Sequence, residues 1–221
     1  MRTFGEGVRG ATRVLVLGCG TGRVSRALAA GGRTVVGVDL SEPMIERARA
    51  QDPGGEYVVG DMCDLTAIKG RLFDAAVIPN AAFSFLRSRR DQLRCLTGLR
   101  GIVRGPLWID VPMPDFALLG VPHTPEAHAW EGLVDGHRIR RTREVWRRPV
   151  EQRLDLLDRY YTVAVPGPQL RTTSELRLRL LFPAEMEWLL ETAGFYADAL
   201  YGDHAGGPVR EGCDRLLVRA L

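Results

Sequence analysis

The chain has 221 residues, of which 45% are hydrophobic and 26% are charged, and its formal net charge is +3. This composition is that of a globular protein with a sizeable core, and it argues against a disordered or fibrous chain. The positive charge is nearly all arginine and is mixed with acids, so we expect no nucleic-acid partner. The chain has no apolar signal segment, no stretch of membrane-spanning length and no Cys-x-x-Cys pair. We therefore expect a cytoplasmic protein with no membrane partner, disulfide or zinc site.

The first half of the chain alternates apolar runs with helical patterns. Apolar strands are expected over residues 13–18, 34–40, 56–61, 72–80 and 106–112. Helices are expected over residues 22–32, 41–51 and 91–102, with Ser41 as the N-cap of the second. Alternation of this kind predicts an α/β fold with a doubly wound parallel sheet that is covered on both faces.

The middle of the chain changes its period. From residue 136 to residue 182 apolar and polar residues alternate, most clearly where Leu176, Leu178 and Leu180 are separated by arginines. This pattern predicts strands over 137–146, 151–165 and 175–182, which form a small antiparallel sheet inserted after strand five. A helix over 183–194 and two closing strands over 195–202 and 214–221 follow. No linker is apparent, so residues 1–221 are expected to form a single domain that contains this insertion.

Three glycines follow the first strand: Gly18, Gly20 and Gly22. A phosphate-binding P-loop requires a lysine that this loop lacks, so that interpretation fails. A dinucleotide fingerprint requires a third glycine at position 23, where the chain has the bulky Arg23. The spacing favours a ligand without pyrophosphate, such as a nucleoside that carries an amino acid.

The ends of the next strands carry groups suited to the rest of such a ligand. Asp39 ends the second strand, and a carboxylate there can accept both hydroxyls of a ribose. The sequence Gly60-Asp61-Met62 stands at the end of the third strand and could hold an adenine edge, while Pro79-Asn80 ends the fourth. All these groups fall at carboxyl ends of parallel strands, where open sheets bind ligands.

These segments resemble a known family. Residues 14–49 (VLVLGCGTGRVSRALAAGGRTVVGVDLSEPMIERAR) look like the first two motifs of class I S-adenosylmethionine-dependent methyltransferases. Residues 57–65, 73–86 and 181–206 resemble later motifs of the small-molecule branch of that family. The resemblance implies a Rossmann-like seven-stranded sheet whose last strand is antiparallel, with S-adenosyl-L-methionine as cofactor. It further implies transfer of a methyl group to oxygen or nitrogen of a small-molecule acceptor, of the kind found in natural product biosynthesis.

The resemblance also implies residue roles. Residues 114–182 would form a cap over the acceptor pocket. The methionine part of the cofactor would contact the glycine loop, the ribose would bind Asp39 between two apolar residues, the adenine would meet the third strand's end, and the sulfonium would lie near the fourth. The residues so implied are Gly18, Cys19, Gly20, Gly22, Asp39, Leu40, Met44, Asp61, Met62, Pro79 and Asn80.

Two departures from the family pattern modify these expectations. The family usually has an acid at position 16 that serves the cofactor's amino group, and this chain has Val16. The cofactor is therefore expected to bind more weakly or to use water at its amino group. Relatives carry a helical segment before the first strand, and only twelve residues precede Arg13. We expect either weak cofactor binding by a monomer or a homodimer in which a neighbour covers the crevice.

Histidines are the candidates for acid–base chemistry. His204 follows the sixth strand, whose carboxyl end faces the crevice, and Asp203 would orient it. His123 and His128 are expected in the loop after strand five, on the same side. Convergence of these two with Glu126 on a metal has little support, and no metal is expected.

Two other functions stay open at this point. One is a protein that binds S-adenosylmethionine without transferring its methyl group, such as a cyclase or a regulator, which the valine at position 16 and the short N-terminus keep in play. The other is a nucleotide-dependent oxidoreductase, which the bulky side chain of Arg23 argues against.

Overall fold

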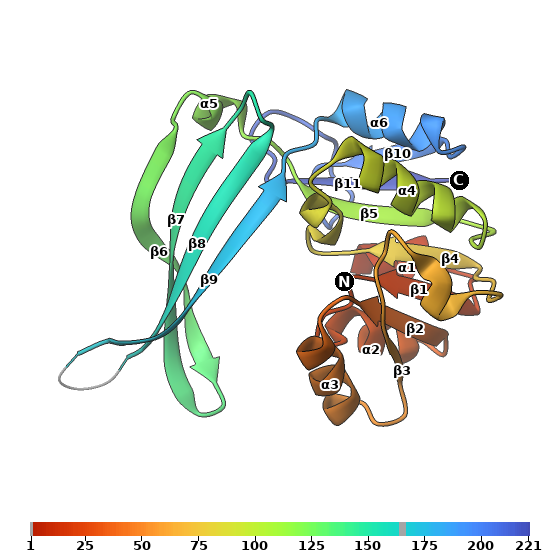
Figure 1. Ribbon diagram of the computed structural model, residues 1–221, viewed down its shortest axis with the longest axis horizontal. Coiled ribbons are helices and arrows are strands. Elements are labelled where there is room, and N and C mark those ends of the chain that lie inside the picture. Colours follow the sequence, from red (N-terminus) through yellow and green to blue (C-terminus); the bar gives the residue numbers. More distant parts are fainter. Residues whose placement is uncertain (1, 164–166) are drawn as a thin grey trace. The chain divides into compact units, whose positions relative to one another are not determined.

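The computed structural model describes residues 2–163 and 167–221, which form two compact units (Figure 1). The main unit runs to Pro114 and resumes at Leu181–Leu221, and the insert unit comprises Asp115–Leu180. No helix among the described residues is both long and apolar enough to cross a membrane.

A seven-stranded sheet forms the centre of the main unit (Figure 1). Its strands β1 to β5 are parallel, β11 is antiparallel to β5, and β10 is antiparallel to β11. This arrangement confirms the predicted doubly wound fold with an antiparallel closing strand. In spatial order the strands are β10 (Ala197–Tyr201), β11 (Arg215–Ala220), β5 (Leu107–Pro112), β4 (Ala75–Ile78), β1 (Arg13–Leu17), β2 (Thr34–Asp39) and β3 (Glu56–Val59).

Helices bury both faces of this sheet. Successive side chains of a strand point to opposite faces, so Leu15 and Leu17 belong to one core cluster and Val14 and Val16 to the other. The first cluster includes residues of α4 (Arg89–Arg100) and α6 (Pro183–Thr192), and the second includes residues of α1 (Arg2–Gly7), α2 (Arg23–Ala29) and α3 (Glu42–Gln51). Coverage on both faces explains why the strands read as nearly continuous apolar runs.

Short 3-10 turns and capped helices complete the main unit. The turns are η1 (Leu65–Ile68) and η2 (Ala82–Phe85). The hydroxyl of Ser88 caps α4 by accepting a hydrogen bond from the backbone N–H of Asp91 at 3.0 Å. The second turn follows directly after β4, so it lies at the carboxyl edge of the sheet, where β1, β2 and β3 also end.

The insert unit is a four-stranded antiparallel sheet in the order β6-β7-β8-β9. It contains α5 (Phe116–Leu119), β6 (His123–Val134), β7 (His137–Arg148), β8 (Arg153–Thr162) and β9 (Gln169–Arg179). The sequence predicted three of these strands and missed β6. The pairing of β6 with β7 shifts register between Thr124 and Ala127 and again between His128 and Trp130. Such irregularities interrupt the two-residue alternation by which strands are recognised. The predicted end of the second inserted strand, residues 164–165, lies outside the described residues.

Candidate functional site

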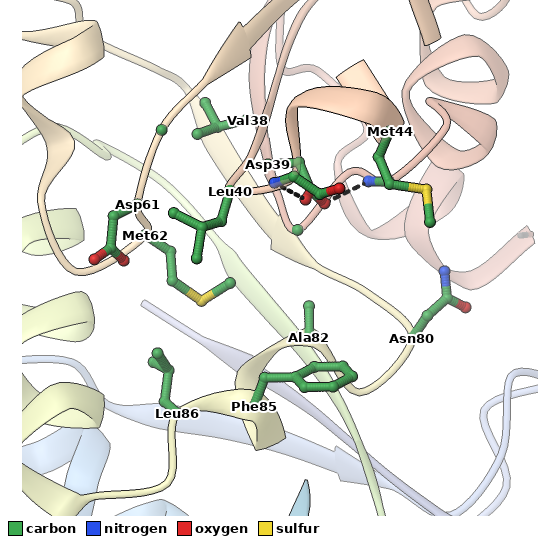
Figure 2. Close-up of a pocket in the computed structure, with 14 residues that line it drawn as sticks. Val38, Asp39, Leu40, Met44, Asp61, Met62, Asn80, Ala82, Phe85 and Leu86 are labelled. Atoms are coloured by element: carbon green, nitrogen blue, oxygen red, sulfur yellow. Dashed lines mark hydrogen bonds between the residues drawn. The ribbon is translucent and has the colours of Figure 1, made fainter. Parts of the chain in front are cut away.

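A cavity of about 660 Å3 opens at the carboxyl edge of the main sheet, beside the ends of β1, β2, β3 and β4 (Figure 2). Its position is the one where open parallel sheets bind ligands. The lining residues are Gly18, Gly20, Val38, Asp39, Leu40, Ser41, Met44, Gly60, Asp61, Met62, Asn80, Ala82, Phe85 and Leu86.

Most residues predicted to bind cofactor meet at this cavity. Those that line it are Gly18, Gly20, Asp39, Leu40, Met44, Asp61, Met62 and Asn80. Cys19, Gly22 and Pro79 do not line it. The sequence reasoning did not single out Val38, Ser41, Ala82, Phe85 and Leu86. Ala82, Phe85 and Leu86 belong to the apolar run after Asn80, and this run is the sequence feature that could have indicated them. The run forms η2 and the residue that follows it, Leu86.

Glycine is favoured at each of the three loop positions for a different structural reason. A Cβ on Gly18, whose φ is +66°, would lie 2.3 Å from the Cβ of Ala82, so this glycine allows the loop to approach η2. Gly22 has a φ of +78°, and a Cβ there would lie 2.6 Å from the hydroxyl of Tyr57, so it is a packing glycine. Gly20 has a φ of +55°, and a Cβ there would meet no protein atom within 4 Å. Of the three, Gly20 alone keeps its backbone open on the side where a side chain would stand.

Cys19 and Pro79 are buried residues next to the cavity and support its wall without lining it. Cys19 is buried, and its backbone N–H donates to the carbonyl oxygen of Val38 at 3.1 Å, which ties the glycine loop to β2. Burial, helped by the negative charge of Asp39, raises the pKa of its thiol to about 12. Pro79 is buried as well, and its carbonyl oxygen accepts a hydrogen bond from Ala82. Neither side chain is available to a ligand in the cavity.

The carboxylate of Asp39 is held by the backbone on two sides. Its Oδ2 accepts a hydrogen bond from Gly20 N–H at 2.8 Å, and its Oδ1 accepts one from Ser41 N–H at 2.9 Å (Figure 2). An ionised carboxylate has about four lone-pair sites, so about two remain for hydroxyl donors. Asp39 is therefore fixed in position and still able to accept a diol.

Apolar side chains surround this carboxylate although they are open to solvent. Leu40 is 73% exposed, Phe85 48% and Met44 42%, and all three line the cavity (Figure 2). Exposed apolar groups that gather around one cavity mark a site for an apolar or aromatic ligand surface. The walls suit a planar base, with the hydroxyl acceptor of Asp39 beside them.

Asp61 and Met62 form the β3 side of the cavity. Asp61 Oδ1 accepts a hydrogen bond from Cys63 N–H at 2.8 Å, and the residue is exposed. Its carboxylate therefore keeps acceptor capacity toward the cavity. Met62 reaches the glycine loop, because its Cε would lie 3.6 Å from a Cβ on Gly18. The sequence had placed both residues at the adenine, and the structure puts both at the cavity.

Val16 does not reach this cavity. Its side chain is fully buried in the cluster that contains Val14, Val24 and Tyr57. The position at which the family usually has an acid is thus part of the apolar core in this chain.

Asp110, which the sequence reasoning did not single out, is a fully buried carboxylate on β5. Arg215 Nη1 donates to its two oxygens at 2.7 and 2.8 Å, and Asn80 N–H donates to Oδ2 at 3.1 Å. Asn80 and Ala81 have φ values of 53° and 64°, in the left-handed region, and Ala81 N–H donates to the backbone oxygen of Asp110 at 2.9 Å. Asp110 therefore holds a strained turn that forms part of the cavity wall.

His204 lies beside Asp110, with 3.6 Å between its Nε2 and Asp110 Oδ2. Burial lowers the pKa of His204 below its ordinary value, and the charge of Asp110 partly opposes that shift. The sequence had named Asp203 as its orienting acid, and this was wrong. The Asp203 carboxylate accepts hydrogen bonds from Ala205 N–H and Gly207 N–H, which lower its pKa and shape the local loop.

His123 and His128 lie on β6 of the insert unit, which corrects their expected place in a loop. His123 Nε2 lies 2.8 Å from Glu144 Oε1, and its ring stacks on Trp146. Glu126, the proposed third member of a convergent set, contacts Thr142, Tyr161 and Arg159 instead. In the described ranges no three His, Cys, Asp or Glu residues gather as a metal site would require.

Fold and cavity together define a class of protein: an open α/β sheet with a ligand cavity at its glycine loop and at the carboxyl ends of its parallel strands. Residues 14–104 match the model of a family described as a methyltransferase domain. That match covers less than half of the chain, so the chain is similar to this family over the segment that holds the glycine loop and the ends of β1 to β4.

Two curated relatives match part of the chain. YqeM of Bacillus subtilis (strain 168), which carries a methyltransferase name, is 33% identical over 104 residues, or 45% of this chain and 42% of that protein. The cypemycin N-terminal methyltransferase of a Streptomyces species is 39% identical over 89 residues, or 39% of this chain and 35% of that protein. The matched segments thus span well under half of both relatives.

Solved structures share the fold over nearly the whole chain. The CcbJ methyltransferase from Streptomyces caelestis has a TM-score of 0.81 at 20% identity and covers 99% of this chain and 88% of its own. CalS10 from Micromonospora echinaspora, an amino pentose methyltransferase solved with S-adenosylmethionine bound, has a TM-score of 0.75 at 19% identity and covers 99% and 86%.

Proposed function

We propose that this protein transfers a methyl group from S-adenosylmethionine to a nitrogen or oxygen atom of a small molecule. One observation carries the proposal: Asp39, fixed by two backbone donors, stands with spare acceptor capacity between exposed apolar walls and next to the glycine loop. A diol acceptor beside a site for a planar base is what an adenosine requires.

The residues at the cavity fit this cofactor in a definite order. Asp61 and Met62 would hold the adenine, Asp39 the ribose, and Gly18 and Gly20 the amino-acid part. The open side of Gly20, where a Cβ would meet no protein atom, suits close approach of its backbone to that part. When bound, S-adenosylmethionine supplies a methyl group on a positively charged sulfur, which makes that carbon electrophilic.

Positioning is the main task of the protein in such a reaction. Holding a nucleophile in line with the methyl group and excluding water can supply about 7–11 kcal/mol of the barrier. The turn at Asn80, held by Asp110 in a left-handed conformation, is a rigid wall of the cavity and suits this role.

His204 is the residue we propose as general base. An amine or a hydroxyl acceptor must lose a proton, and a base typically contributes about 10²–10⁴-fold. The lowered pKa of His204 keeps its imidazole neutral at neutral pH and so able to accept a proton. Its neighbour Asp110 also binds Asn80, which connects His204 to the cavity wall. His123 contacts Glu144, and both His123 and His128 lie on β6 of the insert unit and do not line the cavity, so they are weaker candidates.

A nitrogen acceptor has support from two of the compared proteins. The cypemycin enzyme is named for an N-terminus, and CalS10 is described as acting on an amino pentose. The second candidate function is binding of S-adenosylmethionine without methyl transfer. It is favoured by the apolar core at position 16, where relatives usually have an acid.

Two measurements test the proposal. Calorimetry should show binding of S-adenosylhomocysteine and no binding of NAD, because Arg23 occupies the position of the third dinucleotide glycine. Mass spectrometry after incubation with S-adenosylmethionine and either an amino sugar, a peptide with a free N-terminal amine or a phenol should show the mass gain of one methylene group. Binding of NAD in preference to S-adenosylhomocysteine would overturn the proposal. Cofactor binding without transfer to any acceptor would favour the second function.

A further inference from the structure

Arg23 is an exposed cation next to the cavity. It begins α2, directly after the last loop glycine, and its Nη2 donates to the side-chain oxygen Oδ1 of Asn80 at 3.1 Å. Within the described ranges no carboxylate lies at ion-pair distance from it. The Arg23 side chain thus links the loop after β1 to the turn after β4. Its hydrogen bond there is to a neutral acceptor, the amide oxygen of Asn80.

The position of Asn80 places this cation at one end of the cavity. Figure 2 shows Asn80 on the opposite side from Asp61 and Met62, with Asp39 between them. If adenine lies at Asp61 and ribose at Asp39, the amino-acid part of the ligand extends toward Asn80 and the glycine loop. Arg23 therefore stands where the charged end of that part would lie.

The charges around this end favour recognition of a carboxylate over an ammonium. Val16 supplies no acid, since it is buried in the apolar core. Asp110 is the carboxylate that contacts Asn80, but Arg215 binds both of its oxygens. Arg23 is left as the cation without a charged partner, and a guanidinium can pair with a carboxylate through two parallel hydrogen bonds, which a single amide oxygen cannot offer.

We propose that Arg23 binds the α-carboxylate of the cofactor's amino-acid part and gives up the Asn80 side-chain oxygen to do so. Charge recognition at this end of the ligand would then rest on the carboxylate, in place of the ammonium contact that position 16 provides in relatives. This inference rests on the proposed function, because it requires an adenosine ligand that carries an amino acid.

The test compares three ligands by calorimetry: S-adenosylhomocysteine, its decarboxylated analogue, which keeps the amine, and 5′-methylthioadenosine, which lacks both groups. Arg23→Gln should weaken binding of S-adenosylhomocysteine by about 10- to 100-fold, as expected for a hydrogen bond to a charged group. It should leave the affinities for the other two ligands within about twofold of wild type. Arg23→Lys, which keeps the charge without the planar fork, should fall between wild type and Arg23→Gln.

Arg104→Gln is the matched control, because Arg104 is exposed, makes no side-chain hydrogen bond or ion pair among the described residues and precedes β5 at the opposite edge of the sheet. It should change none of the three affinities. An equal loss of all three ligands in Arg23→Gln, or no loss of any, would overturn the carboxylate assignment. If the wild-type protein binds neither S-adenosylhomocysteine nor 5′-methylthioadenosine, the proposed function is overturned instead.

Discussion

A hydrogen bond of 2.8 Å joins the backbone N–H of Gly20 to the Oδ2 atom of Asp39. It ties the loop after β1 to the end of β2, two elements that are parallel neighbours in the sheet. The same carboxylate accepts Ser41 N–H at the start of α3. One side chain therefore organises the backbone of the site while keeping acceptor capacity for a ligand.

Asp39→Ala should weaken binding of S-adenosylhomocysteine by about 1.5–3 kcal/mol, the usual contribution of hydrogen bonds to a charged group. Calorimetry measures this change. Asp64→Ala is the control, because Asp64 also accepts a backbone N–H, that of Thr66, but does not line the cavity. The control should bind normally. Wild-type affinity in a folded Asp39→Ala protein would remove Asp39 from the site.

Alanine at Gly18 should mainly affect stability, and alanine at Gly20 should mainly affect ligand binding. Gly18→Ala should lower the melting temperature strongly, because its Cβ would lie 2.3 Å from that of Ala82 and its φ is +66°. Adding Ala82→Gly should recover part of this loss, with the left-handed backbone still costing about 1–3 kcal/mol.

Gly20→Ala should carry the backbone cost alone, since a Cβ there meets no protein atom within 4 Å. Its main effect should be on ligand affinity, because the new methyl group would stand in the space that we assign to the cofactor. Thermal unfolding with and without S-adenosylhomocysteine separates the two effects. Unchanged stabilisation by the ligand in Gly20→Ala would contradict this assignment.

Val16→Asp should destabilise the protein without ligand, because Val16 is fully buried among apolar residues and a buried charge without a partner is costly. Val16→Ala is the matched control, since it creates a cavity but no charge, and it should unfold at a higher temperature than Val16→Asp. If the new carboxylate reaches the cofactor's amino group, S-adenosylhomocysteine should bind Val16→Asp more tightly than wild type. Equal stability of the aspartate and alanine variants would show that position 16 is hydrated.

The pKa of His204 should depend on its burial and on the charges of Asp110 and Arg215. Its pKa should lie below the ordinary value of about 6.5, because burial disfavours the imidazolium, with the positive charge of Arg215 acting in the same direction. Asp110 opposes the shift, so Asp110→Asn should lower the pKa further. NMR measures both, with His204→Gln to assign the resonance. A higher pKa in Asp110→Asn would contradict this electrostatic account.

The same shift has a consequence for stability. The folded pKa of His204 is lower than the unfolded pKa, so the unfolded chain binds more protons between the two values. The free energy of unfolding should therefore fall as pH drops from about 6.5 toward the folded pKa, and His204→Gln should flatten this dependence. Denaturant titrations at several pH values measure it, and an unchanged slope in His204→Gln would argue against it.

The sequence by itself determined the sheet, its two covered faces and the place of the ligand site. These depend on local patterns: apolar runs mark buried strands, and strand ends such as Asp39 and Asn80 meet because parallel strands end at one edge. The same reasoning brought Gly18, Gly20 and Asp61 to the cavity without knowledge of any contact.

Only the tertiary structure decided which side chains meet across the sheet. Asp110 and Arg215 are 105 residues apart, and they pair because β5 and β11 are adjacent, a neighbour relation that no local period encodes. The packing of Tyr57 on Gly22 and the register shifts of β6 are likewise set by partner strands or side chains. For the same reason Asp110, and not the adjacent Asp203, is the acid beside His204: proximity in a folded sheet follows strand order and not chain order.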